Sequence, residues 1–281
     1  MHASEIEDIE IALFRDALQL RYGYDFSGYA PASFKRRVLA LRDAFGFKTV
    51  SHLTERLIHD EHLITEIIGK LSVPVSEMFR DPLMFKRLRE DVAPMLATWP
   101  VINIWQAGCA RGEEVYSLAI LLRECGLYER CHIFATDFSD DALARAEEGI
   151  YPLKEARLYS ENYLKSGGPG SLSDWITTGY ERFRVDESLR EHVTFANHNL
   201  VSDGVFGEMQ LVVCRNVLIY FSDGLQDRAL GLFRDSLVYG GFLCLGSREN
   251  LDYSAVAEHF EALPGRQSIY RRIRRPDGVR H

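Results

Sequence analysis

Five short apolar runs, most of them separated by helical patterns, constrain the fold of the last two-thirds of the chain more than any other feature. They are VINIW from residue 101, CHIFATD from 131, VTFA from 193, MQLVVC from 209 and GFLCLG from 241. Such runs of β-branched and aromatic residues favour strands. Strands that alternate with helices are typical of a parallel sheet with crossover helices. We therefore predict an α/β domain with a mostly parallel sheet.

The first 95 residues show helical spacing instead. The segment SFKRRVLALRDAFGF places Phe34, Val38, Leu41 and Phe45 on one helix face, between a start at Pro31 and an end at Gly46. A later segment, RDPLMFKRLREDVAPML, predicts one more helix with Asp81 as its N-cap. We predict a helical N-terminal domain with an interdomain segment over residues 1–95, and a sheet domain over 96–281. A Gly/Ser/Pro-rich stretch near 165–190 is either an ordered insertion or a flexible loop.

Composition excludes several classes of protein. The net charge of −8 gives no bias toward nucleic acid. No apolar run approaches the roughly 18 residues of a membrane-spanning helix, so we expect no membrane insertion. The start of the chain, MHASEIEDIEIALF, is acidic and lacks the basic residues of a signal peptide. We expect a cytoplasmic protein. None of the five cysteines forms a C-x-x-C pair, and no spacing supports a metal site.

The turn after the first predicted strand, Gln106 to Gly112, leads into a helix that starts with two acids. Gly108 and Gly112 permit a tight turn and close approach of a ligand. Without a G-x-G-x-x-G pattern, pyrophosphate binding has little support. Glu113 and Glu114 would repel a phosphate but suit a ligand with an ammonium group or hydroxyls. Alternatively, they only complement the helix macrodipole.

Polar residues also follow the other strands. Asp137 ends the second strand, where an acid commonly holds ribose hydroxyls; alternatively, it is an acid at the start of the next helix. Asn199 and Asn216 follow the third and fourth strands. An asparagine can serve as a turn residue or pair with an adenine edge, and both interpretations stay open here.

Taken together, these segments resemble the CheR family of S-adenosylmethionine-dependent methyltransferases, which esterify glutamates of chemoreceptors. The resemblance extends over nearly the whole chain and is carried, in family order, by SVPVSEMFRDP, AGCARGEEVYSLA, ATDFSDDALARAEEGIY, HNLV, CRNVLIYF and LGSRENL, with FKRRVLALR before them. It implies a class I methyltransferase fold: a Rossmann-like, mostly parallel sheet with an N-terminal all-helical domain. It also implies S-adenosylmethionine as the cofactor, S-adenosylhomocysteine as the product and a chemoreceptor-like protein as the partner.

The resemblance assigns roles to individual residues. Glu113 or Glu114, with Ala107 and Gly108 in the preceding turn, would hold the methionine and ribose parts of the cofactor, and Asp137 the ribose hydroxyls. The pairs Asn199–Leu200 and Asn216–Val217 would line the adenine and the side of the cofactor pocket formed by the fourth strand. From the interdomain segment, Ser76 and Arg80 would reach the cofactor. Arg80 and Tyr220 would lie beside the reacting methyl group, and the basic helix with Lys35, Arg36, Arg37 and Arg42 would contact the receptor.

Some of these residues have simpler explanations, and some positions depart from the family. Arg80 can be a surface ion-pair partner of Asp81 or Glu77, and Tyr220 a core aromatic. Residues 28–50 carry a net charge of +4, which is either a solvated face or a platform for acidic receptor helices. Pro74 replaces an asparagine of the enteric enzymes and cannot supply its amide. The resemblance makes the insertion near 165–190 a candidate for the family's small β-subdomain, which docks a receptor tail peptide in some members. The stretch 167–186 is long for the family, so such docking stays open here.

The expected chemistry fits the residues that are present. A glutamate carboxylate, with a pKa of about 4.3, is already ionised at neutral pH, so methyl transfer needs no metal and no strong base. Positioning of two reactants is the main requirement. The sequence therefore predicts a protein-glutamate O-methyltransferase. A catalytically weak, S-adenosylmethionine-binding regulatory module and a small-molecule methyltransferase are the alternatives.

Overall fold

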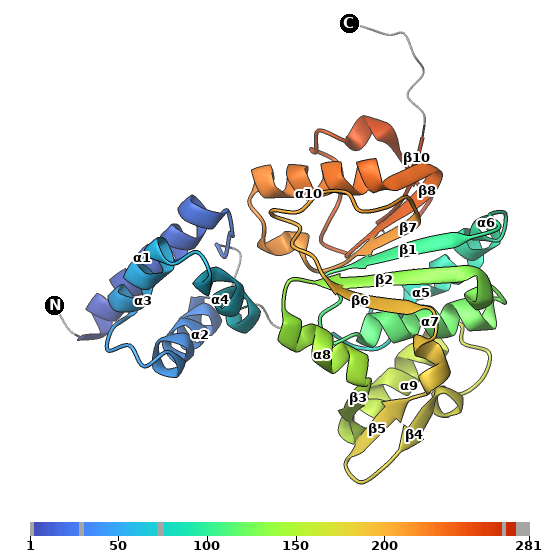
Figure 1. The fold of residues 1–281 in the computed structure, drawn as a ribbon, viewed down its shortest axis with the longest axis horizontal. Helices are drawn as coiled ribbons and strands as arrows, with labels where there is room; N and C mark the ends of the chain where they lie inside the picture. Colours follow the sequence, from blue (N-terminus) through green and yellow to red (C-terminus); the bar gives the residue numbers. More distant parts are fainter. Residues whose placement is uncertain (1–2, 28–30, 72–75, 266–267, 274–281) are drawn as a thin grey trace, which may run out of the picture. The chain divides into compact units, whose positions relative to one another are not determined.

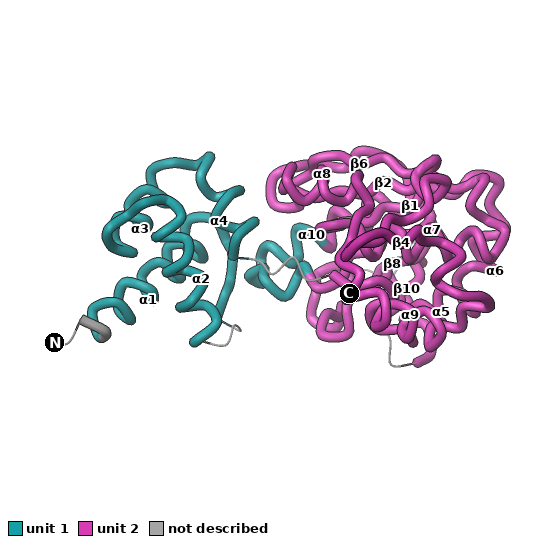
Figure 2. The backbone as a smooth tube through the Cα atoms, turned by 90° about the horizontal axis from the view of Figure 1, so that it is seen from below, with its two compact units in different colours: residues 1–74, 217–229 teal, residues 75–216, 230–281 magenta. Residues whose placement is uncertain are grey.

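The computed structural model describes residues 3–27, 31–71, 76–265 and 268–273. The chain divides into two compact units, residues 1–74 with 217–229 and residues 75–216 with 230–281 (Figure 2). The helical stretch 82–96, which the sequence analysis groups with the N-terminal domain, lies in the second unit. The domain division at residue 95 itself stays a prediction.

The first unit is built from four helices: α1 (Ala3–Tyr22), α2 (Pro31–Ala44), α3 (Val50–His59) and α4 (Leu63–Leu71). As predicted, α2 begins at Pro31 and buries Phe34, Val38 and Leu41. The side chain of Thr49 caps α3 by accepting a hydrogen bond from the His52 N–H. Apolar residues at helical spacing thus form the core of this unit.

A distant segment, residues 217–229, completes the first unit. It contains the turn η6 (Leu218–Tyr220) and the start of α10 (Asp223–Ser236). Tyr24 forms an antiparallel bridge with Phe221, and the Asp25 N–H donates to the carbonyl of Tyr220 (2.9 Å). The helical patterns of the first 95 residues give no indication of this partner.

The second unit holds a seven-stranded sheet in the order β6-β2-β1-β7-β8-β10-β9 (Figure 1). All five apolar runs are strands of this sheet, and the contacts among them are parallel, which confirms the predicted fold class. Only β10 and β9 run antiparallel to their neighbours. The strands are β1 (Ile102–Ala107), β2 (Cys131–Asp137), β6 (Val193–Asn197), β7 (Met209–Cys214), β8 (Leu237–Leu245), β9 (Phe260–Ala262) and β10 (Ile269–Arg272).

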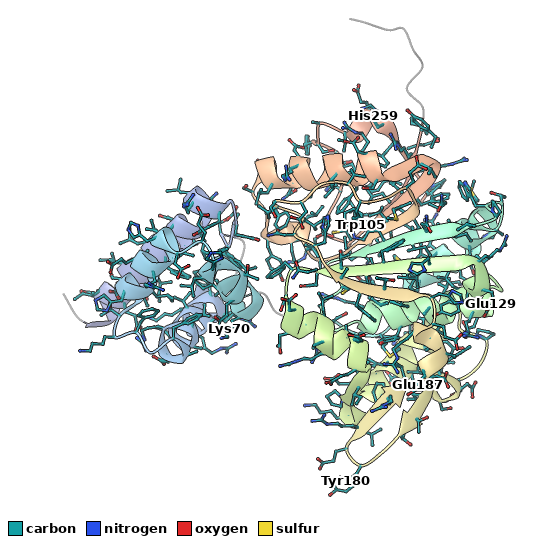
Figure 3. All side chains as sticks on the ribbon, viewed as in Figure 1. Lys70, Trp105, Glu129, Tyr180, Glu187 and His259 are labelled. Atoms are coloured by element: carbon teal, nitrogen blue, oxygen red, sulfur yellow. The ribbon has the colours of Figure 1, made fainter. Side chains whose placement is uncertain are left out.

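Helices cover both faces of this sheet, which explains why its central strands are apolar throughout. On one face, Ile102 and Ile104 share a core with the buried residues of α7 (Glu113–Glu124). On the other, Trp105, labelled in Figure 3, packs on Phe233 of α10 with ring centroids 5.3 Å apart. All residues of β7 are buried.

The remaining elements of the second unit surround this core. A continuous helical stretch consists of α5 (Pro82–Arg87), the π-helical η1 (Leu88–Val92) and α6 (Ala93–Leu96). Pro94 has no N–H to donate to the carbonyl of Glu90, which accounts for the π-helical turn before it. This unit also contains three short connections and a crossover helix: η2 (Tyr128–Arg130), η5 (Glu187–Arg190), η7 (Ala257–His259) and α8 (Asp140–Glu148).

The predicted insertion is ordered. In chain order this region contains β3 (Ile150–Pro152), η3 (Leu153–Glu155), α9 (Ala156–Lys165), η4 (Leu172–Trp175), β4 (Ile176–Thr178) and β5 (Arg182–Val185). The three strands form a small antiparallel sheet with β5 in the middle. The capping box of Ser171 and Asp174 fixes the Gly-rich part, and the Gly170 N–H donates to the Tyr163 hydroxyl. Tyr180 lies at the tip of the β4–β5 turn (Figure 3). Within the described residues, no helix has the length and apolar character needed to cross a membrane.

The two ends of α7 provide a matched test of packing. Gly112 (φ 85°) and Gly126 (φ 67°) are both left-handed, but a Cβ on Gly112 would lie 2.9 Å from Ala146 Cβ, whereas one on Gly126 meets nothing within 4 Å. We expect Gly126→Ala to cost about 1–2 kcal/mol for its backbone conformation alone. Gly112→Ala should cost about 1–3 kcal/mol more because of the overlap with α8. Equal losses in urea unfolding would contradict the packing role of Gly112.

Candidate functional site

The carboxyl ends of β1, β2 and β7 meet at one edge of the sheet. Ala107 pairs with Thr136 on one side and with Cys214 on the other. After β1, the next two strands of the sheet, β2 and β6, are added on one side of β1, and the following strands, β7 and β8, on the other. The direction in which strands are added therefore reverses at β1. This switch point is where open α/β sheets bind ligands.

The turn after β1 is held against the end of β2. The N–H groups of Gly108 and Cys109 both donate to the carbonyl of Thr136 (2.8 and 2.9 Å). Gly108 and Ala110 have positive φ angles of 71° and 47°. The second glycine of the turn, Gly112, lies against Ala146 of α8. It serves helix packing there, and only Gly108 remains as a glycine for close approach of a ligand.

Asp137 connects the turn after β1 to the turn after β2. Its Oδ2 accepts from the Ala110 N–H (2.9 Å) and its Oδ1 from the Ser139 N–H (3.0 Å). Burial raises the pKa of this carboxyl group, and hydrogen bonds from backbone N–H groups lower it. Ser139, not Asp137, caps α8. Helix capping therefore does not account for Asp137.

The two acids at the start of α7 lie in different environments. Glu114 Oε1 accepts from Gln106 Nε2 (3.1 Å), and its Oε2 accepts from Arg215 Nη1 (2.5 Å). This side chain therefore contacts residues at the ends of β1 and β7.

Glu113 is fully buried among residues from the segment 151–159. Burial raises its pKa from 4.5 to about 7, although Arg111 Nη2 lies 2.8 Å from its Oε1 and lowers the pKa in part. Burial is the main cause of the raised pKa values of Tyr151 and Tyr159, and the nearby carboxylate of Glu113 raises them further. Tyr151 donates to the carbonyl of Arg111 (2.7 Å). Glu113 thus lies where β3 and α9 pack against the turn after β1.

Arg215 is a buried residue that the sequence analysis did not select. Its guanidinium is 1% exposed and binds two carboxylates, Glu114 through Nη1 and Asp81 through Nη2, at 2.5 Å each. Asp81 stands at the N-cap position of α5 as predicted, but its side chain makes no capping hydrogen bond. A charged residue directly after an apolar strand, VVCR, was the available indication of this role.

Glu249 is a second residue that was not selected. Its Oε2 accepts from the N–H groups of Asn216 (2.9 Å) and Gly246 (2.7 Å). Asn216 has a left-handed backbone (φ 60°), and a Cβ on Gly246 would lie 2.6 Å from this carboxylate oxygen. The end of β8 therefore fixes the backbone of Asn216 at the end of β7.

The remaining cofactor candidates of the second unit come from the turn after β6 and from the segment before α5. Asn199 Oδ1 accepts from the Val201 N–H (2.9 Å), so its side chain stabilises a turn, while Leu200 is buried. Ser76 and Arg80 are half-buried, and Pro74 lies outside the described residues. The Phe79 N–H, next to Arg80, donates to Ser117 Oγ of α7 (2.8 Å). This hydrogen bond anchors the Arg80 segment to the helix that carries Glu114.

The first unit holds the other predicted residues. The Tyr220 ring stacks on Phe26 with centroids 6.0 Å apart, and Val217 begins the same segment. On α2, Lys35 pairs with Glu7 and Asp8, Arg42 pairs with Asp43, and Arg37 Nη1 donates to the carbonyl of Leu71. Arg36 is exposed. Much of the basic helix is thus engaged within the unit itself.

The site at the sheet edge is rich in hydrogen-bond acceptors. The carboxylates of Glu114 and Asp137 and the buried Gln106 Oε1, which has no hydrogen-bond partner in the described part of the chain, lie at the ends of β1 and β2. Two carboxylates share the single guanidinium of Arg215. This arrangement suits a ligand with a positive charge and hydroxyl donors. No group of His, Cys, Asp and Glu among the described residues is arranged to hold a metal ion.

The buried Glu113 predicts a measurable pH dependence of stability. The folded protein binds its proton more tightly than the unfolded chain, so the stabilisation is complete below pH 4.5 and is lost as the pH rises through 7. Between about pH 5 and 8.5 the wild type should lose about 2–3 kcal/mol relative to Glu113→Gln in urea unfolding. The control is Glu61→Gln, at a side chain that is 71% exposed and pairs with an arginine. A Glu113→Gln profile parallel to that of wild type would show that Glu113 does not titrate in this range.

Both compact units match known families. Residues 9–72 match the all-alpha domain of CheR methyltransferase, and residues 74–269 match the SAM-binding domain of CheR methyltransferase. The chain is 52% identical over 265 residues to a Pseudomonas putida protein named "Putative methyltransferase Cher3", covering 94% of this chain and 97% of the relative. It is 30% identical over 231 residues to a chemotaxis protein methyltransferase of Listeria innocua, covering 82% and 85%. The chain therefore belongs to the CheR family of S-adenosylmethionine-dependent methyltransferases.

Proposed function

We propose that the chain transfers the methyl group of S-adenosylmethionine to glutamate carboxylates of a chemoreceptor-like signalling protein in the cytoplasm, forming glutamyl methyl esters. The observation that carries this proposal is the match of both CheR domains, in order, over residues 9–269. Relatives named chemotaxis protein methyltransferase support a receptor as the acceptor. In this proposal, the helical domain contacts the receptor and the sheet domain binds the cofactor.

For the cofactor, the geometry favours Glu114 over Glu113. Glu114 lies with Gln106 and Arg215 at the sheet edge, whereas Glu113 is enclosed near Tyr151 and Tyr159. We assign the amino-acid part of the cofactor to Glu114 and the turn at Ala107 and Gly108, and the ribose hydroxyls to Asp137. Further lining is assigned to Ser76, Asn199, Leu200, Asn216 and Val217.

For the reaction, the residues of the chain have to position two groups and exclude water. The cofactor supplies an electrophilic methyl group: a carboxylate oxygen forms the new C–O bond as the C–S bond breaks, and the electron pair of that bond stays on sulfur. Arg80 orients the carboxylate through a forked pair of hydrogen bonds. Tyr220 positions a reacting group through its hydroxyl. Because the acceptor is already ionised at neutral pH, no side chain has to remove a proton.

The reaction is tested with labelled S-adenosylmethionine and receptor cytoplasmic domains, by counting base-labile methyl esters. We expect esters on a cognate receptor, and a roughly tenfold or larger loss of kcat for Tyr220→Phe. That variant retains the ring that stacks on Phe26, and its melting temperature distinguishes a loss of positioning from a loss of folding. Cofactor binding without ester formation on any receptor would instead indicate a regulatory module. Failure to bind cofactor would contradict both functions.

The ion pairs within the first unit bear on which residues of α2 we propose to contact the receptor. Lys35 and Arg42 pair with acids of their own unit, which leaves Arg36 as the exposed cation of the four. We expect Arg36→Glu to slow receptor methylation by roughly 3- to 10-fold at about 0.05 M salt, and by less at about 0.5 M. Cofactor affinity should not change. Arg56→Glu on α3, at a side chain 58% exposed, is the matched control. Equal effects of the two substitutions would exclude a specific platform on α2.

A further inference from the structure

Arg215 connects two parts of the site that are far apart in sequence. Its buried guanidinium, 1% exposed, binds Glu114 on α7 and Asp81 before α5, residues 101 and 134 positions away. The three side chains together keep one excess negative charge beside the turn after β1. All of them lie in the second compact unit.

Stability alone gives a weak reason for this arrangement. Apolar residues of similar volume often replace a buried ion pair without loss of stability. What this ion pair adds is a fixed direction, because the planar guanidinium presents Nη1 to Glu114 and Nη2 to Asp81 at a fixed angle to each other. Arg215 follows the fully buried strand β7, so its backbone is among the best-anchored parts of the sheet.

The segment that receives this constraint has an unusual backbone. Phe79 (φ 54°) and Asp81 (φ 55°) are both left-handed, and they stand on either side of Arg80. Residues other than glycine rarely adopt this conformation unless their surroundings enforce it. On one side, the Phe79 N–H donates to Ser117 Oγ. On the other, the Asp81 carboxylate pairs with Arg215 and makes no capping contact with α5.

We propose that Arg215 is a positioning residue that orients the Glu114 carboxylate toward the cofactor and, through Asp81, fixes the backbone of Arg80. One guanidinium thereby sets the spacing between the cofactor-binding acid and the arginine that orients the acceptor. The Arg80 half of this inference rests on the proposed function. The Glu114 half concerns cofactor binding alone.

The Arg80 half is tested with Asp81→Asn, which keeps the shape of a side chain that is 44% exposed but removes its charge. We expect kcat for receptor methylation to fall roughly tenfold, with affinity for S-adenosylhomocysteine within about threefold of wild type. Asp91→Asn is the matched control, because it removes an acid paired with Arg87 in the same helical stretch. It should leave kcat unchanged.

A double-mutant cycle separates positioning of Arg80 from general loosening of the structure. If Asp81 acts through Arg80, Asp81→Asn should have no further effect on kcat in an Arg80→Ala background. The same tenfold loss with and without Arg80 would overturn this half of the proposal.

The Glu114 half is tested by calorimetric titration with S-adenosylhomocysteine, which needs no acceptor protein. We expect Arg215→Gln to weaken binding roughly tenfold or more, and Arg215→Lys to recover only part of the loss because an ammonium group does not hold two carboxylates at the fixed angle of a planar guanidinium. Wild-type affinity in a folded Arg215→Gln would overturn this half. If instead the wild type binds S-adenosylhomocysteine but methylates no receptor, the proposed function fails while this titration still decides the role of Arg215.

Discussion

The parallel register of β1, β2 and β7 is the constraint on which the rest of the site depends. Because Ala107 lies between Thr136 and Cys214, every chain segment that leaves these strands begins at the same edge. Two carboxylates then connect the segments to one another: Asp137 binds N–H groups of two turns, and Glu249 binds those of Asn216 and Gly246. Backbone donors that strands cannot satisfy at their ends are thus used to fix the loops around the site.

The adjacent acids Glu113 and Glu114 lie in different electrostatic environments near this edge, and burial explains the difference. Glu114 pairs with the buried Arg215, which it shares with Asp81, whereas Glu113 has only the partly exposed Arg111 and shows a pKa raised to about 7. A carboxyl group with such a pKa is a poor constant anchor for a cation near neutral pH. Glu114 lies 100° further around the helix and contacts residues at the ends of β1 and β7 instead. Two adjacent acids with the same chemistry therefore acquire different roles from their surroundings.

The sequence predicted the parts of the molecule that follow from local pattern. Continuous apolar runs identified β1, β2, β7 and β8 because helices cover both faces of the sheet there. The outer strand β6, which has no fully buried residue, was identified by its β-branched and aromatic residues. The short β9 and β10 were not recognised, since three or four residues with charged members give no clear period. Asp137 was selected as a candidate by its place at the end of a strand, and its role stays a prediction. The ion pairs of Arg215 with Glu114 and Asp81 were not predicted, because these residues are more than 100 positions away and their contacts depend on tertiary packing. The attachment of residues 217–229 to the helical unit was missed for the same reason.

The chemistry proposed for this site explains why its buried charges hold positions and do not move protons. Methyl transfer from a sulfonium to a carboxylate joins a cation to an anion, so charge decreases as the bond forms. A tight ion pair on the acceptor would favour the reactants over the transition state, so Arg80 has to orient the carboxylate without binding it too tightly. Catalysis must therefore come mostly from holding the reactants at fixed distances and directions. Such positioning can lower the activation free energy by about 7–11 kcal/mol. A guanidinium such as Arg215, which stays protonated and binds two carboxylates in a fixed fork, suits this requirement better than a titratable histidine or lysine would.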